Sequence, residues 1–211
     1  MTFFSSILIL FLAQTPQVER ITEHVYRVGA VTVDVKARTV TCSGVVNMDQ
    51  GVVEYVAVAP KGKLHESVFR LDVRPLHLQV ALLMLDLEPK NVLQFQGERK
   101  TPQGDKIILT VKWRDSKGMM QEVPVESLMM TQPKERPLER GAWVFTGSRV
   151  IKQGFEADIS RSLIAVYPDP AAIVDNPRPN ASARTFFVNP RRCPKRNTKV
   201  ELIFSAIEKG N

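Results

Sequence analysis

Alternating hydrophobic and polar residues recur along most of the chain and predict a series of short β-strands. Residues 31–35 alternate valine with polar side chains, and residues 39–46 return after a short polar turn, so together they predict a hairpin. A denser apolar run at 52–59 predicts a central strand. Further strands are expected at 64–73, 106–114, 119–125, 143–146, around 155, and at 162–167, 184–188 and 199–205.

One segment, residues 75–87, predicts a helix instead. Pro75 is favoured at the first helical position because its missing N–H would have had no partner there. Apolar residues then recur at three- and four-residue spacing and cover nearly the whole circumference, so we expect a helix buried against a sheet face. In that position Leu83→Asp is expected to abolish folding. The predicted class is α+β, mainly antiparallel β, as a sheet or sandwich with one buried apolar helix.

The first 14 residues predict an export signal. Residues 3–13 are apolar apart from two serines, are too short to span a bilayer as a helix, and are followed by polar residues. An uncleaved anchor or a buried strand is the alternative. Residues 15–29 are expected to form a polar lead-in and residues 30–211 a single domain. The rest of the chain has no stretch apolar enough to span a membrane. Together with the export signal, this predicts a location in the periplasm or cell envelope.

The formal net charge of +7 originates in one region. Of 29 basic residues, seven lie between residues 178 and 199, where no acidic residue occurs, and the remaining 22 match the 22 acidic residues. A solvated basic loop is the simplest interpretation. In an exported protein it could also bind a partner protein or an anionic envelope component such as lipid headgroups, lipopolysaccharide or polysaccharide. The candidate contacts are Arg184, Arg191, Arg192, Lys195 and Arg196.

Other partners and cofactors find little support. Nucleic acid is not expected, because neither a recognition helix nor a basic stretch interleaved with aromatic residues is present. In an oxidising compartment Cys42 and Cys193 could form one disulfide, and two unrelated thiols are the alternative. Two cysteines without Cys-x-x-Cys spacing cannot hold an iron–sulfur cluster unaided. No cofactor is therefore predicted.

Residues 64–67, with the sequence Leu-His-Glu-Ser, contain the densest group of candidate catalytic side chains. On a strand His65 and Ser67 would share one face about 7 Å apart, too far for a nucleophile and its base. The candidates for an acid–base site in this region are His65, Glu66, Ser67 and His77. The simpler interpretation is that His65 makes internal hydrogen bonds and that His77 lies on the helix surface.

A metal site is a second possibility for the same region. His65, Asp72 and His77 would suit zinc if the strand end meets the helix start, although their spacing matches no established signature. Asp158, Asp169 and Asp175 lack the ligand spacing of a calcium loop, and we interpret Asp169 and Asp175 as turn residues.

Several motifs together carry a resemblance to a known family. They are Val45-Val46-Asn47, Glu54-Tyr55 and residues 62–67, 75–78, 143–148 and 163–177. Over residues 30–205 the chain resembles the YdjY-like family of bacterial exported proteins. The resemblance implies an envelope-associated protein and assigns no reaction. Some members are lipoproteins or are labelled ferredoxin-like, but this chain has neither a lipobox cysteine nor cluster ligands, so neither label transfers.

These observations favour an exported, non-enzymatic binding or interaction module. The alternative is a metal-assisted or acid–base enzyme centred on residues 65–67 and the start of the helix.

Overall fold

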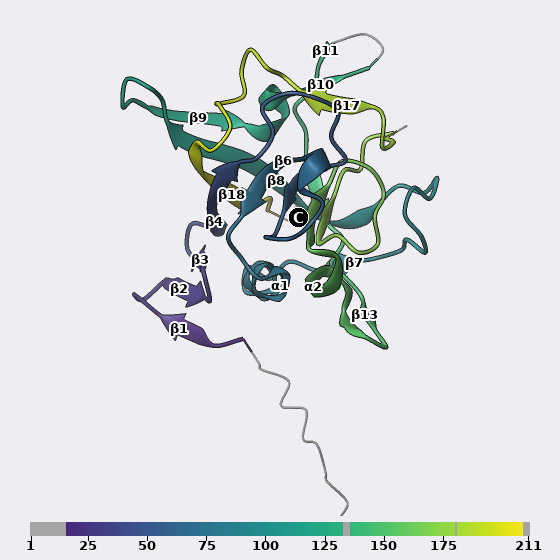
Figure 1. Cartoon of the computed structure of the whole chain (residues 1–211). Coiled ribbons are helices and arrows are strands. Elements are labelled where there is room, and N and C mark those ends of the chain that lie inside the picture. Colours follow the sequence, from purple (N-terminus) through teal and green to yellow (C-terminus); the bar gives the residue numbers. More distant parts are fainter. Residues whose placement is uncertain (1–15, 133–135, 180, 209–211) are drawn as a thin grey trace, which may run out of the picture.

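Eight strands close into a barrel in the computed structural model, which describes residues 16–132, 136–179 and 181–208 (Figure 1). The strand order around the barrel is β4-β18-β8-β12-β16-β15-β5-β6, and β6 pairs back to β4. Most neighbours are antiparallel, whereas β15–β16 and β5–β6 are parallel. The strands are β4 (Thr39–Val46), β5 (Tyr55–Val58), β6 (Ser67–Leu71), β8 (Gln103–Arg114), β12 (Trp143–Phe145), β15 (Ser162–Ala165), β16 (Val174–Asp175) and β18 (Lys199–Ala206).

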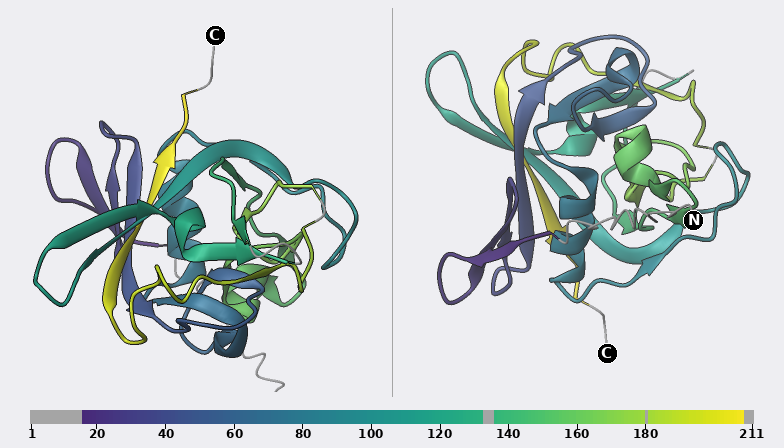
Figure 2. Two further views of the ribbon diagram at one scale, coloured as in Figure 1. Left: turned by 90° about the horizontal axis from the view of Figure 1, so that it is seen from above. Right: turned by 60° about the horizontal axis from the view of Figure 1, so that its bottom comes forward.

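The prediction of a mainly β, sheet-rich fold with few helices is confirmed, but the sheet closes into a barrel and is not a sandwich. The long strands β4, β18 and β8 pair side by side, and β8 curves round the barrel (Figure 2). Gly44 allows the last contact, because a β-carbon there would collide with the carbonyl oxygen of Arg70 in β6. A closed barrel satisfies the strand edges that an open sheet would leave exposed.

Further strands extend the barrel on its outside. A meander of β1 (Val18–Arg20), β2 (Val25–Val28) and β3 (Val31–Asp34) continues from β4, and β9 (Met120–Pro124) and β7 (Pro89–Lys90) pair with β8. The meander and the β8–β9 hairpin project from the same side of the barrel (Figure 2). Separate small sheets are formed by β10 (Met129–Thr131), β11 (Arg136–Pro137) and β17 (Phe186–Val188), and by β13 (Val150–Ile151) and β14 (Gly154–Phe155).

Most predicted strands are confirmed, with two corrections near the N-terminal half. The expected lead-in over residues 15–29 instead contributes β1 and β2 to the main sheet. The strand expected at 64–73 begins at Ser67, because residues Leu64–Glu66 form a single 3₁₀ turn. The export signal predicted for residues 1–14 lies outside the described residues.

The predicted helix begins at Pro75, but it is shorter and less buried than expected. Helix α1 (Pro75–Leu83) packs beside β2, β3 and β4, and a second short helix, α2 (Glu156–Ser160), lies next to it. The buried residues of α1 are Pro75, Leu78, Ala81 and Leu82, whereas Leu83 is 45% exposed. The expectation that Leu83→Asp abolishes folding therefore loses its basis. No helix among the described residues is long and apolar enough to cross a membrane.

Candidate functional site

The connection between β17 and β18 carries most of the excess positive charge. We call residues 189–198 the basic loop; it runs across the top of the view in Figure 1. At its start the backbone N–H of Asn189 donates to the carbonyl of Leu128 (2.8 Å), and the N–H of Cys193 donates back to Asn189 (2.9 Å). At its end the N–H of Asn197 donates to Val46 of β4 (2.8 Å). The backbone is thus fixed at both ends, and the buried side chain of Cys193 fixes it in the middle.

The cationic side chains of the basic loop point outward. Arg191, Arg192, Lys195 and Arg196 are all exposed, as is Arg184 just before β17. The ammonium of Lys195 lies 3.8 Å from the carboxylate of Asp49. Among the described residues no carboxylate forms an ion pair with the guanidinium of Arg191, Arg192 or Arg196. These charges are therefore available to an external anion.

Two hollows border the basic loop. The first, of about 560 Å³, has Arg191 and Arg192 at its rim, and its other lining residues are Met130, Pro137, Phe187, Asn189 and Pro190. The second, of about 430 Å³, lies between Arg196 and His65 and is completed by Asn47, Met48, Asp49, Gln50 and Leu64. The first has four apolar residues in its lining beside Asn189 and two cations, and the second is lined mainly by polar residues.

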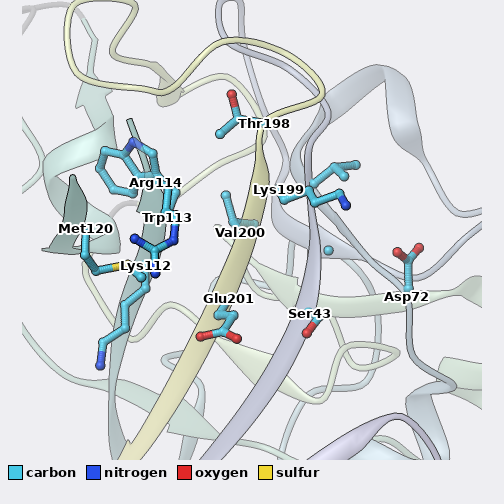
Figure 3. A pocket seen from close by; sticks show the side chains of 12 residues that line it. Ser43, Asp72, Lys112, Trp113, Arg114, Met120, Thr198, Lys199, Val200 and Glu201 are labelled. Carbon is cyan, nitrogen blue, oxygen red and sulfur yellow. The ribbon is translucent and has the colours of Figure 1, made fainter. Parts of the chain in front are cut away.

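A third hollow, of about 620 Å³, lies on the outside of β4, β18 and β8, just beyond the end of the basic loop (Figure 3). Lys112 and Arg114 of β8 line one side, and Asp72 lies on the opposite side of Glu201. The ammonium of Lys112 is 3.1 Å from the carboxylate of Glu122. Because acids stand close to its cations, this hollow suits an external anion less well than the basic loop does.

A family model of the YdjY domain matches residues 31–205. The chain belongs to the YdjY domain family. The match begins at the first residue of β3, ends inside β18, and includes the whole basic loop. It confirms the family indicated by the sequence motifs. Comparison with curated proteins and with solved structures finds no match.

The catalytic candidates of this YdjY domain do not assemble into a nucleophile and base. His65 is exposed on the 3₁₀ turn, with its imidazole 3.6 Å from the carboxylate of Glu66. Ser67 is buried, and its hydroxyl donates to the carbonyl of Lys63 (2.6 Å). The ring of His77 instead covers Gly29 in the turn between β2 and β3.

The metal candidates of the YdjY domain also lie in different surroundings. Asp72 forms an ion pair with Arg70 (3.3 Å), whereas His65 lines the hollow below Arg196. Burial, and secondarily the charge of Arg74, lowers the pKa of His77. Across residues 16–132, 136–179 and 181–208 no group of three or more His, Cys, Asp or Glu side chains could hold a metal ion.

Cys42 and Cys193, considered above as a disulfide pair, are both free thiols in this structure. Cys42 lies within β4 and is fully buried in the core. Cys193 is buried beneath the basic loop, with its sulfur 3.9 Å from the carbonyl oxygen of Met48. Burial raises the pKa of Cys193 to about 12, so this thiol stays protonated and unreactive at neutral pH.

Sequence patterns did not predict a buried polar cluster around Tyr55 of β5. Asp175, interpreted as a turn residue, lies instead in strand β16 and is buried. Asp169, also interpreted as a turn residue, is buried and accepts a hydrogen bond from the hydroxyl of Tyr55 (2.8 Å). Tyr167 donates similarly to the carboxylate of Glu54 (2.9 Å), which lies 3.6 Å from the ammonium of Lys63. An acidic residue within the otherwise apolar segment 163–174 was the signal that could have indicated burial. Because its carboxyl and hydroxyl groups are bonded to each other and Tyr55, Tyr167 and Asp169 are buried, we interpret this cluster as structural.

Proposed function

We propose that this YdjY domain is an exported, non-enzymatic binding module whose basic loop holds an anionic component of the bacterial envelope. The single observation that carries the proposal is the set of exposed guanidinium groups of Arg191, Arg192 and Arg196 without ion-pair partners among the described residues. Guanidinium groups present a planar set of donors that matches phosphate and carboxylate oxygens.

The fixed backbone of the basic loop strengthens the proposal. Hydrogen bonds from Asn189 to Leu128, at the end of a 3₁₀ turn, and from Asn197 to Val46 of β4 hold the loop before any ligand arrives. A loop that is already ordered loses little conformational entropy on binding, so more of the electrostatic attraction contributes to affinity. A long solvated loop without such anchors would give a weaker and less specific contact.

A metal-assisted or acid–base reaction at His65, Glu66 and His77 has less support. The hydroxyl of Ser67 is occupied by the carbonyl of Lys63, and His77 packs on Gly29 away from the hollow that His65 lines. The side chain of His65 is 81% exposed, so it lacks the desolvated surroundings that tune most catalytic residues.

The test removes the charges of the basic loop. Arg191→Gln, Arg192→Gln and Arg196→Gln combined should elute from immobilised heparin, and detach from anionic vesicles, at a clearly lower salt concentration than the wild type. The control, Lys36→Gln, Lys61→Gln and Lys152→Gln combined, removes the same charge from three exposed turns elsewhere. Equal retention of the two triple variants would show that net charge, not the basic loop, governs binding, and would refute the proposal.

Export is tested separately. Expression of the full chain in a bacterial host should place it in the periplasmic or envelope fraction, and mass spectrometry should identify the cleavage site near residue 14 if the signal is removed. Recovery of the protein exclusively in the cytoplasmic fraction would contradict this part of the proposal.

A further inference from the structure

A row of apolar side chains lies on the outer face of the small sheet beside the basic loop. Phe187 of β17 pairs with Met130 of β10, and Met130 pairs with Pro137 of β11. On its other side Phe187 forms an isolated bridge with Val52. Residues directly opposite one another in neighbouring strands point to the same face, so these four form one row.

The burial pattern shows which way this row points. Phe186 and Val188, on either side of Phe187 in the chain, are buried in the core, as is Met129 beside Met130. Successive residues of a strand alternate between faces, so Phe187 and Met130 must point away from the core. Val52 is 46% exposed, and Pro137 is exposed as well. Phe187 and Met130 are themselves half-buried, so the row presents part of its apolar surface to solvent at a position where a strand normally carries polar residues.

This apolar row and the two arginines share one hollow. The hollow of about 560 Å³ is lined by Met130, Pro137 and Phe187 on its apolar side and by Arg191 and Arg192 at its rim. A ligand that satisfies both parts needs an apolar chain and an anionic group at one end. Polysaccharides and nucleic acids would leave the apolar lining unused, and a neutral hydrocarbon would leave the guanidinium groups without a partner.

We propose that this hollow binds one single-chain amphiphile with a phosphate headgroup, of the lysophospholipid type. The acyl chain lies along the row from Phe187 to Pro137, and Arg191 and Arg192 hold the phosphate. The proposal rests on the proposed function of the basic loop and names the ligand class that its first arginines take.

Two features select this ligand over related ones. The hollow is lined by two guanidinium groups that form no ion pair within the described part of the chain. They match a phosphate, whose several oxygens can accept from both, better than a carboxylate, whose two oxygens are filled by one bidentate arginine. The concave shape matches a single chain rather than a flat bilayer surface. Within the hollow the row from Phe187 to Pro137 crosses three neighbouring strands, or about 10 Å, which is long enough to cover part of an acyl chain.

The experiment measures binding of myristoyl lysophosphatidylglycerol below its micelle concentration to the full chain by titration calorimetry. Glycerol phosphate supplies the headgroup alone, and myristoyl lysophosphatidylcholine and myristate supply the same chain with other headgroups. We expect lysophosphatidylglycerol to bind most tightly of the four. Equal binding of glycerol phosphate, tighter binding of the choline lipid or of myristate, or binding to phosphatidylglycerol vesicles without binding to the monomer would each overturn the proposal.

Variants separate this proposal from that for the whole basic loop. Met130→Thr combined with Phe187→Thr places polar residues of high β-propensity on the strands, and should weaken lysophosphatidylglycerol binding about tenfold or more while leaving heparin retention unchanged. Val150→Thr removes an apolar residue that is 82% exposed elsewhere and serves as the control. If the double variant binds the lipid as the control does, the lipid proposal fails and the basic loop proposal stands. If the loop triple variant keeps wild-type heparin retention, the proposed function fails instead.

Discussion

The hydroxyl of Tyr55 donates a 2.8 Å hydrogen bond to the carboxylate of Asp169, which follows it by 114 positions in the chain. Tyr55 belongs to β5, and Asp169 lies in the connection between β15 and β16, so the bond fastens this connection to the barrel wall. The side-chain amide of Gln96 donates to the same hydroxyl (2.9 Å) and joins a third segment. Burial, and secondarily the charge of Asp169, raises the pKa of Tyr55, so the hydroxyl remains a donor.

Tyr55→Phe should therefore destabilise the protein. The variant keeps the ring but leaves the buried carboxyl of Asp169 without its side-chain donor, a loss worth about 1–3 kcal/mol. Urea unfolding at neutral pH should show a lower midpoint with an unchanged slope. Tyr26→Phe, in the outer meander, is the control and should change stability by less than about 0.5 kcal/mol. A wild-type midpoint for Tyr55→Phe would mean that the bond contributes nothing.

Asp175 should make stability depend on pH. It is fully buried, and burial, followed by the charge of Asp169, raises its pKa well above the ordinary value of 3.8. The folded protein keeps a proton here that the unfolded chain releases, so this contribution is complete below the unfolded pKa and is lost as the pH rises through the folded pKa. Asp175→Asn should match the wild type near pH 4 and melt at least about 3 °C higher near pH 8.

The matching measurement is a series of thermal unfolding curves across that pH range. Burial also raises the pKa of Asp169, so the variant should keep part of the wild-type slope. Asparagine retains an oxygen to accept from the backbone N–H of Asp169, which approaches both carboxylate oxygens of Asp175 at 3.3 and 3.4 Å. A variant that melts below the wild type at pH 8 would show that Asp175 is stabilising in its charged form.

Local patterns were sufficient to find the strands but not their order. The alternation at residues 39–46 and 199–205 predicted β4 and β18, because each has one face toward the core. Closure depends on pairs far apart in sequence, such as Gly44 with Leu71, which no period of hydrophobicity encodes. Residues 64–66 were included in a predicted strand, yet the hydroxyl of Ser67 donates to the carbonyl of Lys63 and favours a turn there.

Only part of the candidate site could be predicted from the sequence. The charge of Arg191, Arg192 and Arg196 was evident from composition along the chain, and their exposure follows from that charge. The apolar hollow beside them was not evident from the sequence, because it depends on the register of Phe187 against Met130 and on a bridge to Val52. The turn at Asp169 was predicted from its neighbouring prolines, and the carbonyl of Asp169 accepts a hydrogen bond from the backbone N–H of Ala172 (3.1 Å). The burial of Asp169 was not predicted, because turns usually lie at the surface.

Helix α1 offers a test of which face it buries. Leu82 is fully buried beside β2, β3 and β4, whereas its neighbour Leu83 is 45% exposed. Leu82→Asp places a charge in the core and should prevent folding, while Leu83→Asp should cost at most about 1 kcal/mol. Circular dichroism and urea unfolding of the two purified variants measure the contrast. Similar behaviour of both variants would contradict the orientation of the helix.

Gly44 should be essential for closing the barrel. A β-carbon at this position would meet the carbonyl oxygen of Arg70 and the backbone and side chain of Leu71, all in β6, and backbone atoms have little room to move. Gly44→Ala should therefore separate β4 from β6 and destabilise the protein by about 1–3 kcal/mol or more. Ser43→Ala, at the exposed neighbouring position, is the control, with an expected change within about 0.5 kcal/mol.

Hydrogen exchange adds a local measurement. The amide of Asp72, which donates to the carbonyl of Ser43, should exchange faster in Gly44→Ala than in the control. Unchanged stability and exchange in Gly44→Ala would show that β4 and β6 do not approach as closely as the closed barrel requires.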